Sequence, residues 1–292
     1  MEILKAIIPI AGIGTRFLPL SKVVPKELFS LGDKPLIHYV LQELKDSGVQ
    51  EVVFVVGENK KFLSDYFKRA PRLEKFLEER GKKELIEQLR EAEKLAQGIS
   101  ISYVSQLKPD GDAHAVLQAR KLIGNNACFV LYPDDVIVSQ TPCTVQLARV
   151  FKTSQKPVMA LSKVQKERIS SYGVVEADKI ASRLYQVKKV VEKPSPDAIL
   201  SDLAVVGRRV ITPEVFDYIK KAKPNKKREI VLTEVLGEMV KDGKMVYGYE
   251  IEGEWLECGN YEGWMKANAY MALKHPEYGK GIRGFLKEQK LI

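Results

Sequence analysis

Residues 3–27 constrain the fold of this chain more than any other stretch. Residues 3–10 form a short apolar run bounded by turn residues, which is typical of a strand buried on both faces of a parallel sheet. In the loop that follows, Gly12 and Gly14 let backbone N–H groups approach an anion closely. The loop also carries further donors and positive charge, on Thr15, Arg16, Lys22 and Lys26. The stretch therefore predicts a strand followed by a polyphosphate-binding loop.

Two better-known phosphate loops do not match this stretch. A dinucleotide-binding turn needs a third small residue for helix packing, and Phe17 stands in its place. A P-loop needs Gly-Lys-Ser/Thr, whereas the chain has Gly14-Thr15-Arg16. An ordinary strand-to-helix turn would explain a Gly-x-Gly by itself. The arginine and two lysines, at set distances from three prolines, favour the phosphate-binding interpretation.

One ordered motif spans the loop: Gly12-x-Gly14-Thr15-Arg16-x-x-Pro19-x-x-Lys22-x-x-Pro25-Lys26-Glu27. It resembles the signature of the sugar-1-phosphate nucleotidylyltransferase family, and most closely its prokaryotic branch that acts on UTP and glucose 1-phosphate. The resemblance extends from Lys5 to about Met265, with later motifs in order. It implies a transferase that makes UDP-glucose and pyrophosphate with Mg²⁺ as cofactor. Three rival hypotheses are a thymidylyl or broad-specificity transferase, a non-catalytic subunit that senses nucleotide sugars, and a dinucleotide-dependent oxidoreductase.

Composition narrows the class of protein further. With 292 residues, 29% charged and 45% hydrophobic, the chain is predicted to be a soluble globular protein with a sizeable core. We expect no signal peptide and no membrane span, and the three dispersed cysteines suit free thiols in the cytoplasm. The net charge of +9 is spread among 38 acidic residues, so we expect no nucleic-acid partner but two anionic phosphate substrates.

Helical and strand periodicity predict the fold. A helix over 36–48 and a buried strand over 51–57 complete a right-handed βαβ unit with the first strand. Residues 60–97 predict two or three amphipathic helices and resemble an insertion typical of the uridylyltransferase branch. We expect one α/β domain over 1–292: a Rossmann-like mixed, mainly parallel central sheet flanked by helices. Residues 160–260 would supply the sugar-binding part and the C-terminal portion of the sheet.

A strand over 99–104 leads into the expected base-binding loop. Gln106 offers both a donor and an acceptor, which suits a pyrimidine edge. By resemblance this is the uracil loop, although Ala113 stands where the family usually has glycine. His114 is interpreted as a residue that hydrogen-bonds locally at a helix start rather than as a general base. The resemblance implies these nucleotide-binding residues: Ala11, Gly12, Gly14, Thr15, Gln106 and Gly111.

A predicted strand over 127–132 ends in Pro133-Asp134-Asp135. A carboxylate at the end of a central strand, facing the phosphate loop, is where a magnesium ligand would lie, although an acidic pair there is also common in turns. By resemblance Asp134 is the magnesium ligand. Glu257, in a Glu-Cys-Gly motif that is usually Asp-Cys-Gly, is a candidate second ligand.

The sugar-binding side follows a strand predicted over 157–164. By resemblance Gly173 and Glu192 hold sugar hydroxyls, and Lys193 holds the sugar phosphate. Glu192 and Lys193 would point to opposite faces of a strand, so a bend, for which Pro194 is a candidate, must re-aim one of them. Asp202 and Val231 replace an asparagine and a glutamine that are usual in the family.

The resemblance also implies a mechanism and an assembly. Arg16 would stabilise the β- and γ-phosphates of UTP, Lys26 the α-phosphate, and Lys193 the attacking sugar phosphate, in a direct in-line displacement assisted by Mg²⁺ on Asp134. A final helix is predicted over 263–275, and the basic tail beyond it gives no signal. Family members are commonly oligomers, which implies a homodimer or homotetramer.

Overall fold

A computed structural model describes residues 2–57 and 61–292 of the chain. Its main sheet has nine strands. In chain order these strands are β1 (Lys5–Ile10), β4 (Glu51–Val56), β5 (Ser100–Ser105), β6 (Cys128–Leu131), β8 (Val158–Lys163), β9 (Gly173–Ala181), β10 (Leu184–Glu192), β11 (Leu203–Ile211) and β12 (Tyr247–Glu250). Two small ribbons pair β2 (Ser30–Leu31) with β3 (Lys34–Pro35) and β7 (Asp135–Val138) with β13 (Glu254–Glu257).

The order of strands in the sheet is β5-β4-β1-β6-β11-β8-β12-β10-β9. The first four strands pair in parallel, as the predicted βαβ unit requires. β11 runs antiparallel to both of its neighbours, and β10 does the same between β12 and β9. The predicted mixed α/β fold is thus confirmed, with parallel pairing concentrated in the N-terminal half. Short hairpin connections, such as that between β9 and β10, make the C-terminal half largely antiparallel.

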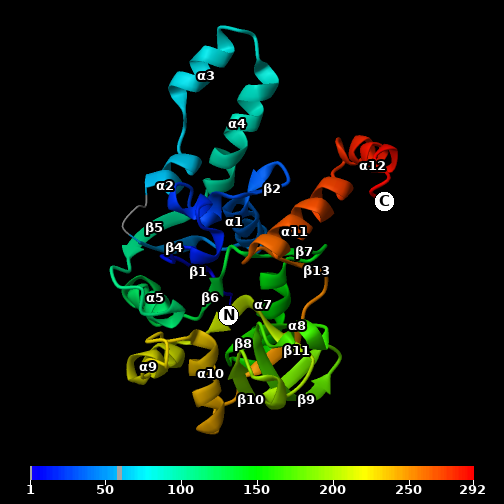
Figure 1. Ribbon diagram of the computed structural model, residues 1–292. Coiled ribbons are helices and arrows are strands. Elements are labelled where there is room, and N and C mark those ends of the chain that lie inside the picture. Colours follow the sequence, from blue (N-terminus) through cyan, green and yellow to red (C-terminus); the bar gives the residue numbers. More distant parts are fainter. Residues whose placement is uncertain (1, 58–60) are drawn as a thin grey trace.

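Helices cover both faces of this sheet (Figure 1). They are α1 (Leu36–Asp46), α2 (Lys61–Phe67), α3 (Pro71–Glu78), α4 (Lys83–Ala96), α5 (Asp112–Gln118), α6 (Arg120–Ile123), α7 (Cys143–Ser154), α8 (Lys166–Ile169), α9 (Pro213–Lys221), α10 (Leu232–Lys241), α11 (Tyr261–Lys274) and α12 (Gly279–Glu288). In β1, Ile8 packs in a core with α1 and α7, and Ile7 packs in a second core with α5, α9 and α10. The strand is therefore buried on both faces, as its apolar run predicts.

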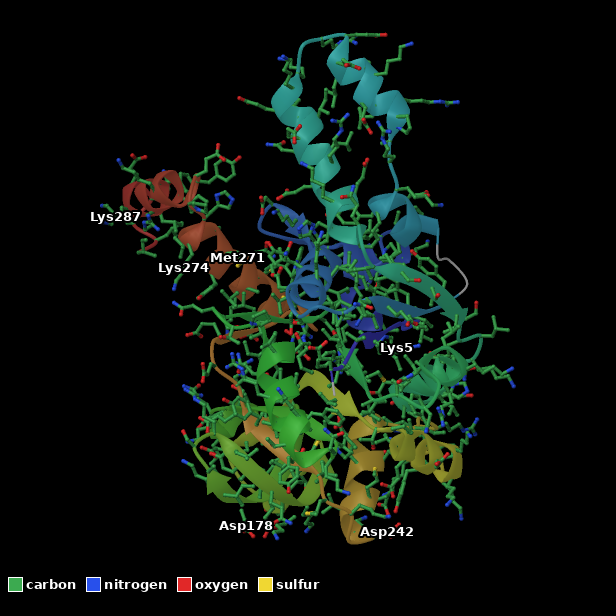
Figure 2. The ribbon with its side chains drawn as sticks, turned by 180° about the vertical axis from the view of Figure 1, so that it is seen from behind. Lys5, Asp178, Asp242, Met271, Lys274 and Lys287 are labelled. Carbon is green, nitrogen blue, oxygen red and sulfur yellow. The ribbon has the colours of Figure 1, made fainter. Side chains whose placement is uncertain are left out.

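Two helical parts project from the body of the molecule. α3 and α4 extend as a hairpin at one end, and α11 continues into α12 at the side (Figure 1). Seen from behind, Asp178 and Asp242 lie at the end opposite to the hairpin (Figure 2). α2, α3 and α4 fall within the predicted helical segment 60–97, of which residue 60 lies outside the described residues. Among the described helices, none is long and apolar enough to cross a membrane.

Phe17, which excluded a dinucleotide-binding turn, has a packing role of its own. Its ring is 1% exposed and meets Phe29 and Tyr261 edge-on, each with ring centroids 5.1 Å away. The Tyr261 hydroxyl also donates to the Phe17 carbonyl at 3.0 Å. These contacts attach the start of α11 to the loop after β1, which fixes the loop against the C-terminal part of the chain.

Candidate active site

A cavity of about 660 Å³ opens beyond the carboxyl ends of β1 and β6. This is where open parallel sheets bind ligands. Every residue to which the sequence assigns a site role lines it: Ala11, Gly12, Gly14, Thr15, Arg16, Lys26, Gln106, Gly111, Asp134, Gly173, Glu192, Lys193 and Glu257. Lys22, expected in the phosphate loop, is exposed and does not line the cavity. Residues far apart in the sequence are thus brought around one space, and their individual roles stay predictions.

Lys26 and Asp134 form an ion pair within this cavity, with Nζ 2.6 Å from Oδ2. Burial acts to lower the pKa of Lys26, but the negative charges of Asp134 and Glu27 outweigh burial, so the pKa of Lys26 is raised. Burial likewise opposes the charge on Asp134, and Lys26 overcomes it, so the pKa of Asp134 is lowered. Both groups are therefore charged at neutral pH.

Asp135 differs from its neighbour, although both are adjacent in sequence. Its Oδ1 accepts a hydrogen bond of 2.6 Å from the Trp255 indole. Burial, followed by the charge of Asp134, raises the pKa of Asp135 to about 7. Two adjacent carboxyls thus have pKa values displaced in opposite directions, because Asp134 is paired directly with Lys26, whereas at Asp135 burial and the charge of Asp134 outweigh the influence of Arg208.

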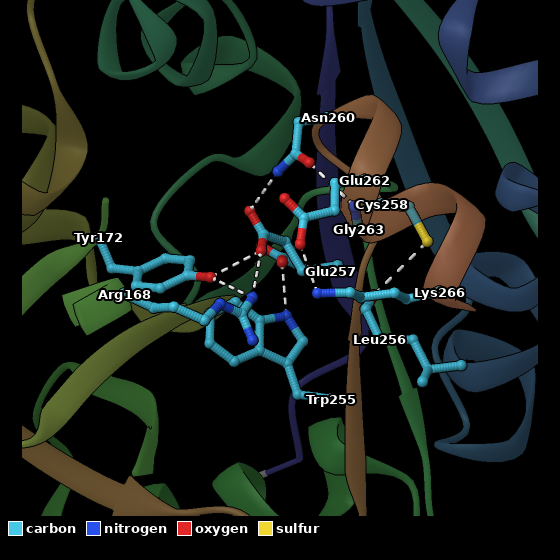
Figure 3. A network of polar contacts seen from close by, with 11 residues as sticks. Arg168, Tyr172, Trp255, Leu256, Glu257, Cys258, Asn260, Glu262, Gly263 and Lys266 are labelled. Atoms are coloured by element: carbon cyan, nitrogen blue, oxygen red, sulfur yellow. Dashed lines mark hydrogen bonds and ion pairs between the residues drawn. The ribbon is translucent and has the colours of Figure 1, made fainter. Parts of the chain in front are cut away.

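Glu257 lies at the centre of a polar network (Figure 3). Its Oε2 accepts from Arg168 Nη2 at 2.9 Å and from the Tyr172 hydroxyl at 2.6 Å. Its Oε1 accepts from Asn260 Nδ2 at 3.1 Å. Both carboxylate oxygens accept hydrogen bonds, so part of the capacity of Glu257 to bind a cation is already in use.

The donor set at this site suits a metal shared with substrate. Among the described residues, no three His, Cys, Asp or Glu side chains gather into a metal-binding group. Mg²⁺ is usually held by one or two carboxylates, substrate phosphates and water, rather than by a complete protein cage. Asp134 fits that pattern, with Asp135 beside it at the strand end, and both line the cavity.

The predicted base-binding loop is held by its own hydrogen bonds. Gln106 Nε2 donates to the Gly111 carbonyl at 2.9 Å and lies 3.0 Å from His114 Nδ1. Gln118 lies 3.1 Å from the other ring nitrogen of His114, so this histidine bonds locally, as the sequence analysis expects. A Cβ at Gly111, where φ is +103°, would collide with the backbone of Ile230. Only glycine allows that approach without strain.

The predicted sugar-binding residues meet where β9 and β10 pair. Gly173 is opposite Glu192 in the antiparallel register. Lys193 has a left-handed φ of 47°, and its Nζ comes to 3.4 Å from Glu192 Oε1. The bend that the sequence requires is therefore at Lys193 itself, one residue before Pro194. A positive φ turns a side chain out of the strict alternation of a strand, so both groups face the cavity.

Several other residues that line the cavity were not singled out by the sequence. They are Asp112, Tyr132, Tyr172, Arg209, Thr233 and Trp255. Tyr132 donates to Asp112, whose Oδ1 accepts from the backbone N–H of Leu232 at 3.0 Å. Two arginines inside the otherwise apolar strand 203–211 are a signal that would have drawn attention to both Arg208 and Arg209. The other five carry no distinguishing pattern in the sequence.

The sequence profile of the nucleotidyl transferase family matches residues 5–273. The chain belongs to this family, whose enzymes generally use a divalent metal ion. It is similar to the UTP--glucose-1-phosphate uridylyltransferase of Staphylococcus haemolyticus, with 37% identity over 98% of both chains. It is also similar to UTP--glucose-1-phosphate uridylyltransferase 1 of Staphylococcus saprophyticus, with 36% identity over 98% of this chain and 99% of that protein.

Solved structures of two similar proteins agree with this assignment. A UDP-glucose pyrophosphorylase complexed with UDP-glucose superposes with a TM-score of 0.84 and 32% identity, over 94% of this chain and 100% of that one. The UTP-bound enzyme from Acinetobacter baumannii gives a TM-score of 0.88 and 30% identity, over 98% and 99% of the two chains. The family expected from the motif around Arg16 and Lys26 is thereby confirmed.

Proposed function

We propose that this chain transfers the uridylyl group of UTP to glucose 1-phosphate, producing UDP-glucose and pyrophosphate. The observation that carries the proposal is the gathering of the phosphate loop, Asp134 and the Glu192–Lys193 pair around one cavity. The names of the similar proteins, together with their UTP and UDP-glucose complexes, supply the substrates.

The chemistry brings two anions together, so positioning and charge neutralisation supply most of the rate. An oxygen of the sugar phosphate attacks the α-phosphorus of UTP, and the bond from that phosphorus to the bridging oxygen breaks as pyrophosphate leaves. Lys193 orients the attacking phosphate, Lys26 neutralises the α-phosphate, and Arg16 binds the leaving pyrophosphate. The attacking oxygen is already anionic, so the reaction needs no general base.

Mg²⁺, held by Asp134 and the substrate phosphates, supplies further neutralisation of the phosphate charge when it is bound. In this structure the Lys26 ammonium is paired with the Asp134 carboxylate. The α-phosphate would attract Lys26, and the Asp134 carboxylate would then be available to hold the cation. Nucleotide and metal would then bind more tightly together than separately.

Pyrophosphate release tests this function directly. We expect rapid release from UTP, Mg²⁺ and glucose 1-phosphate, and slower release when dTTP or galactose 1-phosphate replaces its counterpart. A faster rate with dTTP would transfer the assignment to a thymidylyltransferase. No release with any pair, from protein that still binds UTP, would identify a binding subunit instead of an enzyme.

The role of Lys193 has its own test. Lys193→Ala should lower turnover by orders of magnitude and leave UTP binding largely intact, because the lysine is assigned to the other substrate. Lys189→Ala is the matched control, since Lys189 is an exposed lysine of β10, the strand that ends just before Lys193, and does not line the cavity. An equal loss of UTP binding and turnover in Lys193→Ala would contradict the assignment.

A further inference from the structure

Two consecutive arginines in β11 have very different surroundings. Arg208 points toward α1, where its Nε lies 2.9 Å from Glu43 Oε2. Arg209 points to the other face of the sheet, where its Nη2 donates to Thr233 Oγ1 at 2.8 Å. Within residues 2–57 and 61–292, this is the one hydrogen bond that the Arg209 side chain makes, and no carboxylate in this part of the chain forms an ion pair with it. Arg209 is nevertheless 94% buried, since only 6% of its surface is exposed.

The Arg209 guanidinium thus has unused donors. Its Nε and Nη1 are buried and have no partner among the described residues. An arginine does not escape this situation by losing its proton, because its charge persists at all accessible pH values. The Tyr132 ring, whose centroid is 5.1 Å from Cζ, offers partial compensation. A buried cation with unmet donors destabilises the folded protein, so its presence points to a function that uses it.

Arg209 lines the cavity on its sugar side. Thr233, which accepts the hydrogen bond from Arg209, packs closely against Gly173. If Gly173 carried a Cβ, that atom would lie only 2.7 Å from Thr233 Cγ2. The same added Cβ would lie 2.9 Å from Glu192 Oε2. Arg209 therefore belongs to the same neighbourhood as the two residues assigned to sugar hydroxyls. The cations assigned to phosphates, Arg16, Lys26 and Lys193, are separate from it in sequence and role.

We propose that Arg209 donates hydrogen bonds to hydroxyl oxygens of the sugar ring and so determines which hexose 1-phosphate is accepted. This inference rests on the proposed function. A guanidinium carries N–H donors and no acceptor, and neighbouring hydroxyl oxygens of a hexose can accept from two such donors at once. The unpartnered Nε and Nη1 are both buried, so a turn of the side chain into the cavity that it already lines accompanies sugar binding.

The stability of the unliganded protein separates this role from a structural one. Arg209→Met keeps the length of the side chain and removes the unpaired charge, so the variant should unfold at the same or a higher denaturant concentration than the parent. A structural arginine would give the opposite result. Arg209→Lys, which keeps the charge but loses the fork, serves as the second variant if Arg209→Met does not fold.

The specificity test combines these variants with altered substrates. Pyrophosphate release would be measured with UTP and with glucose 1-phosphate or its 2-, 3-, 4- and 6-deoxy analogues. In the parent enzyme, at least one analogue should lose about 10- to 100-fold in kcat/KM, the size expected for a hydrogen bond from a charged donor. With glucose 1-phosphate, Arg209→Met should have a kcat/KM lower than that of the parent enzyme by a similar factor. With the sensitive deoxy analogue, Arg209→Met and the parent enzyme should have the same kcat/KM. Its KM for UTP should stay within about twofold of the parent value.

Besides a loss of stability in Arg209→Met, two kinetic outcomes would overturn the inference. In one, Arg209→Met lowers kcat/KM by the same factor for glucose 1-phosphate and for every deoxy analogue. In the other, its KM for UTP rises as much as its KM for the sugar phosphate. Failure of the proposed function would look different, because the parent enzyme would then release no pyrophosphate from UTP and glucose 1-phosphate.

Discussion

The buried ion pair between Arg208 and Glu43 should make each partner strongly dependent on the other for the stability of the fold. Arg208 exposes 1% and Glu43 8% of its side chain, and they are 2.9 Å apart. Glu43 Oε1 also accepts from the backbone N–H of Thr144 at 3.0 Å, and Arg208 Nη1 donates to the carbonyls of Tyr132 and Gly207. The pair therefore links α1 and α7 to the strand ends beside Asp134.

Removing one partner leaves the other as an uncompensated buried charge. Arg208→Met and Glu43→Leu should each lower the free energy of unfolding by about 3–5 kcal/mol. The double variant removes both charges. The carbonyls of Tyr132 and Gly207 keep backbone donors, from Asp135 and Tyr132 respectively, so the Thr144 N–H is the main group left without its partner. We therefore expect the double variant to lose only about 1–3 kcal/mol.

Equilibrium urea unfolding of the parent, both single variants and the double variant measures these values as a double-mutant cycle. The reasoning predicts strong non-additivity, with the double variant more stable than either single one. It would be refuted if each single variant lost less than about 1 kcal/mol, or if the loss in the double variant equalled the sum of the two single losses.

Three further predictions concern residues in or beside the cavity. Glu257→Gln should raise the KM for glucose 1-phosphate about fivefold, because the Arg168 and Tyr172 contacts that support Gly173 weaken. Titration of the rate with Mg²⁺ should give an unchanged half-maximal concentration, and a large increase would make Glu257 a metal ligand. Gly111→Ala should lower the free energy of unfolding in urea by about 2–4 kcal/mol, because the added Cβ collides with the backbone of Ile230. Gly98→Ala is the control, because Gly98 also has a positive φ but has open space around it. This variant should lose less unfolding free energy. Burial raises the pKa of Glu27 from 4.5 to about 7, so its contribution to stability is complete below pH 4.5 and is lost as the pH rises through about 7. Glu27→Gln should therefore flatten the decline in unfolding free energy over that range, in metal-free buffer; an unchanged profile would contradict the raised pKa.

Local sequence was enough to predict the first βαβ unit and the loop that carries Arg16 and Lys26. The apolar run of β1 and the paired glycines encode these features within about 25 residues, and no distant contact is needed to recognise them. Motif spacing likewise identified the residues that surround the cavity. α12 was not predicted, because its three glycines, Gly279, Gly281 and Gly284, lower its helix propensity.

Contacts across the fold decided what the sequence could not. Alternation along a strand predicted that Glu192 and Lys193 would diverge, but the left-handed backbone at Lys193 brings them together. That conformation is held by the hydrogen bond from the Lys193 N–H to the Tyr172 carbonyl, 21 residues earlier in the chain. The engagement of Glu257 by Arg168 and Asn260 depends on tertiary contacts in the same way.

The pair Arg208 and Arg209 shows why residue type alone does not reveal function. Both lie in one strand, both are buried, and neither differs from the other in local pattern. Strand alternation sends them to opposite faces, and there the first meets a carboxylate while the second meets a hydroxyl and an aromatic ring. The charge of a fully paired buried arginine is compensated within the fold, whereas an unpaired one destabilises the fold until a ligand supplies the acceptors. The balance of donors and acceptors therefore assigns Arg208 to structure and Arg209 to the substrate.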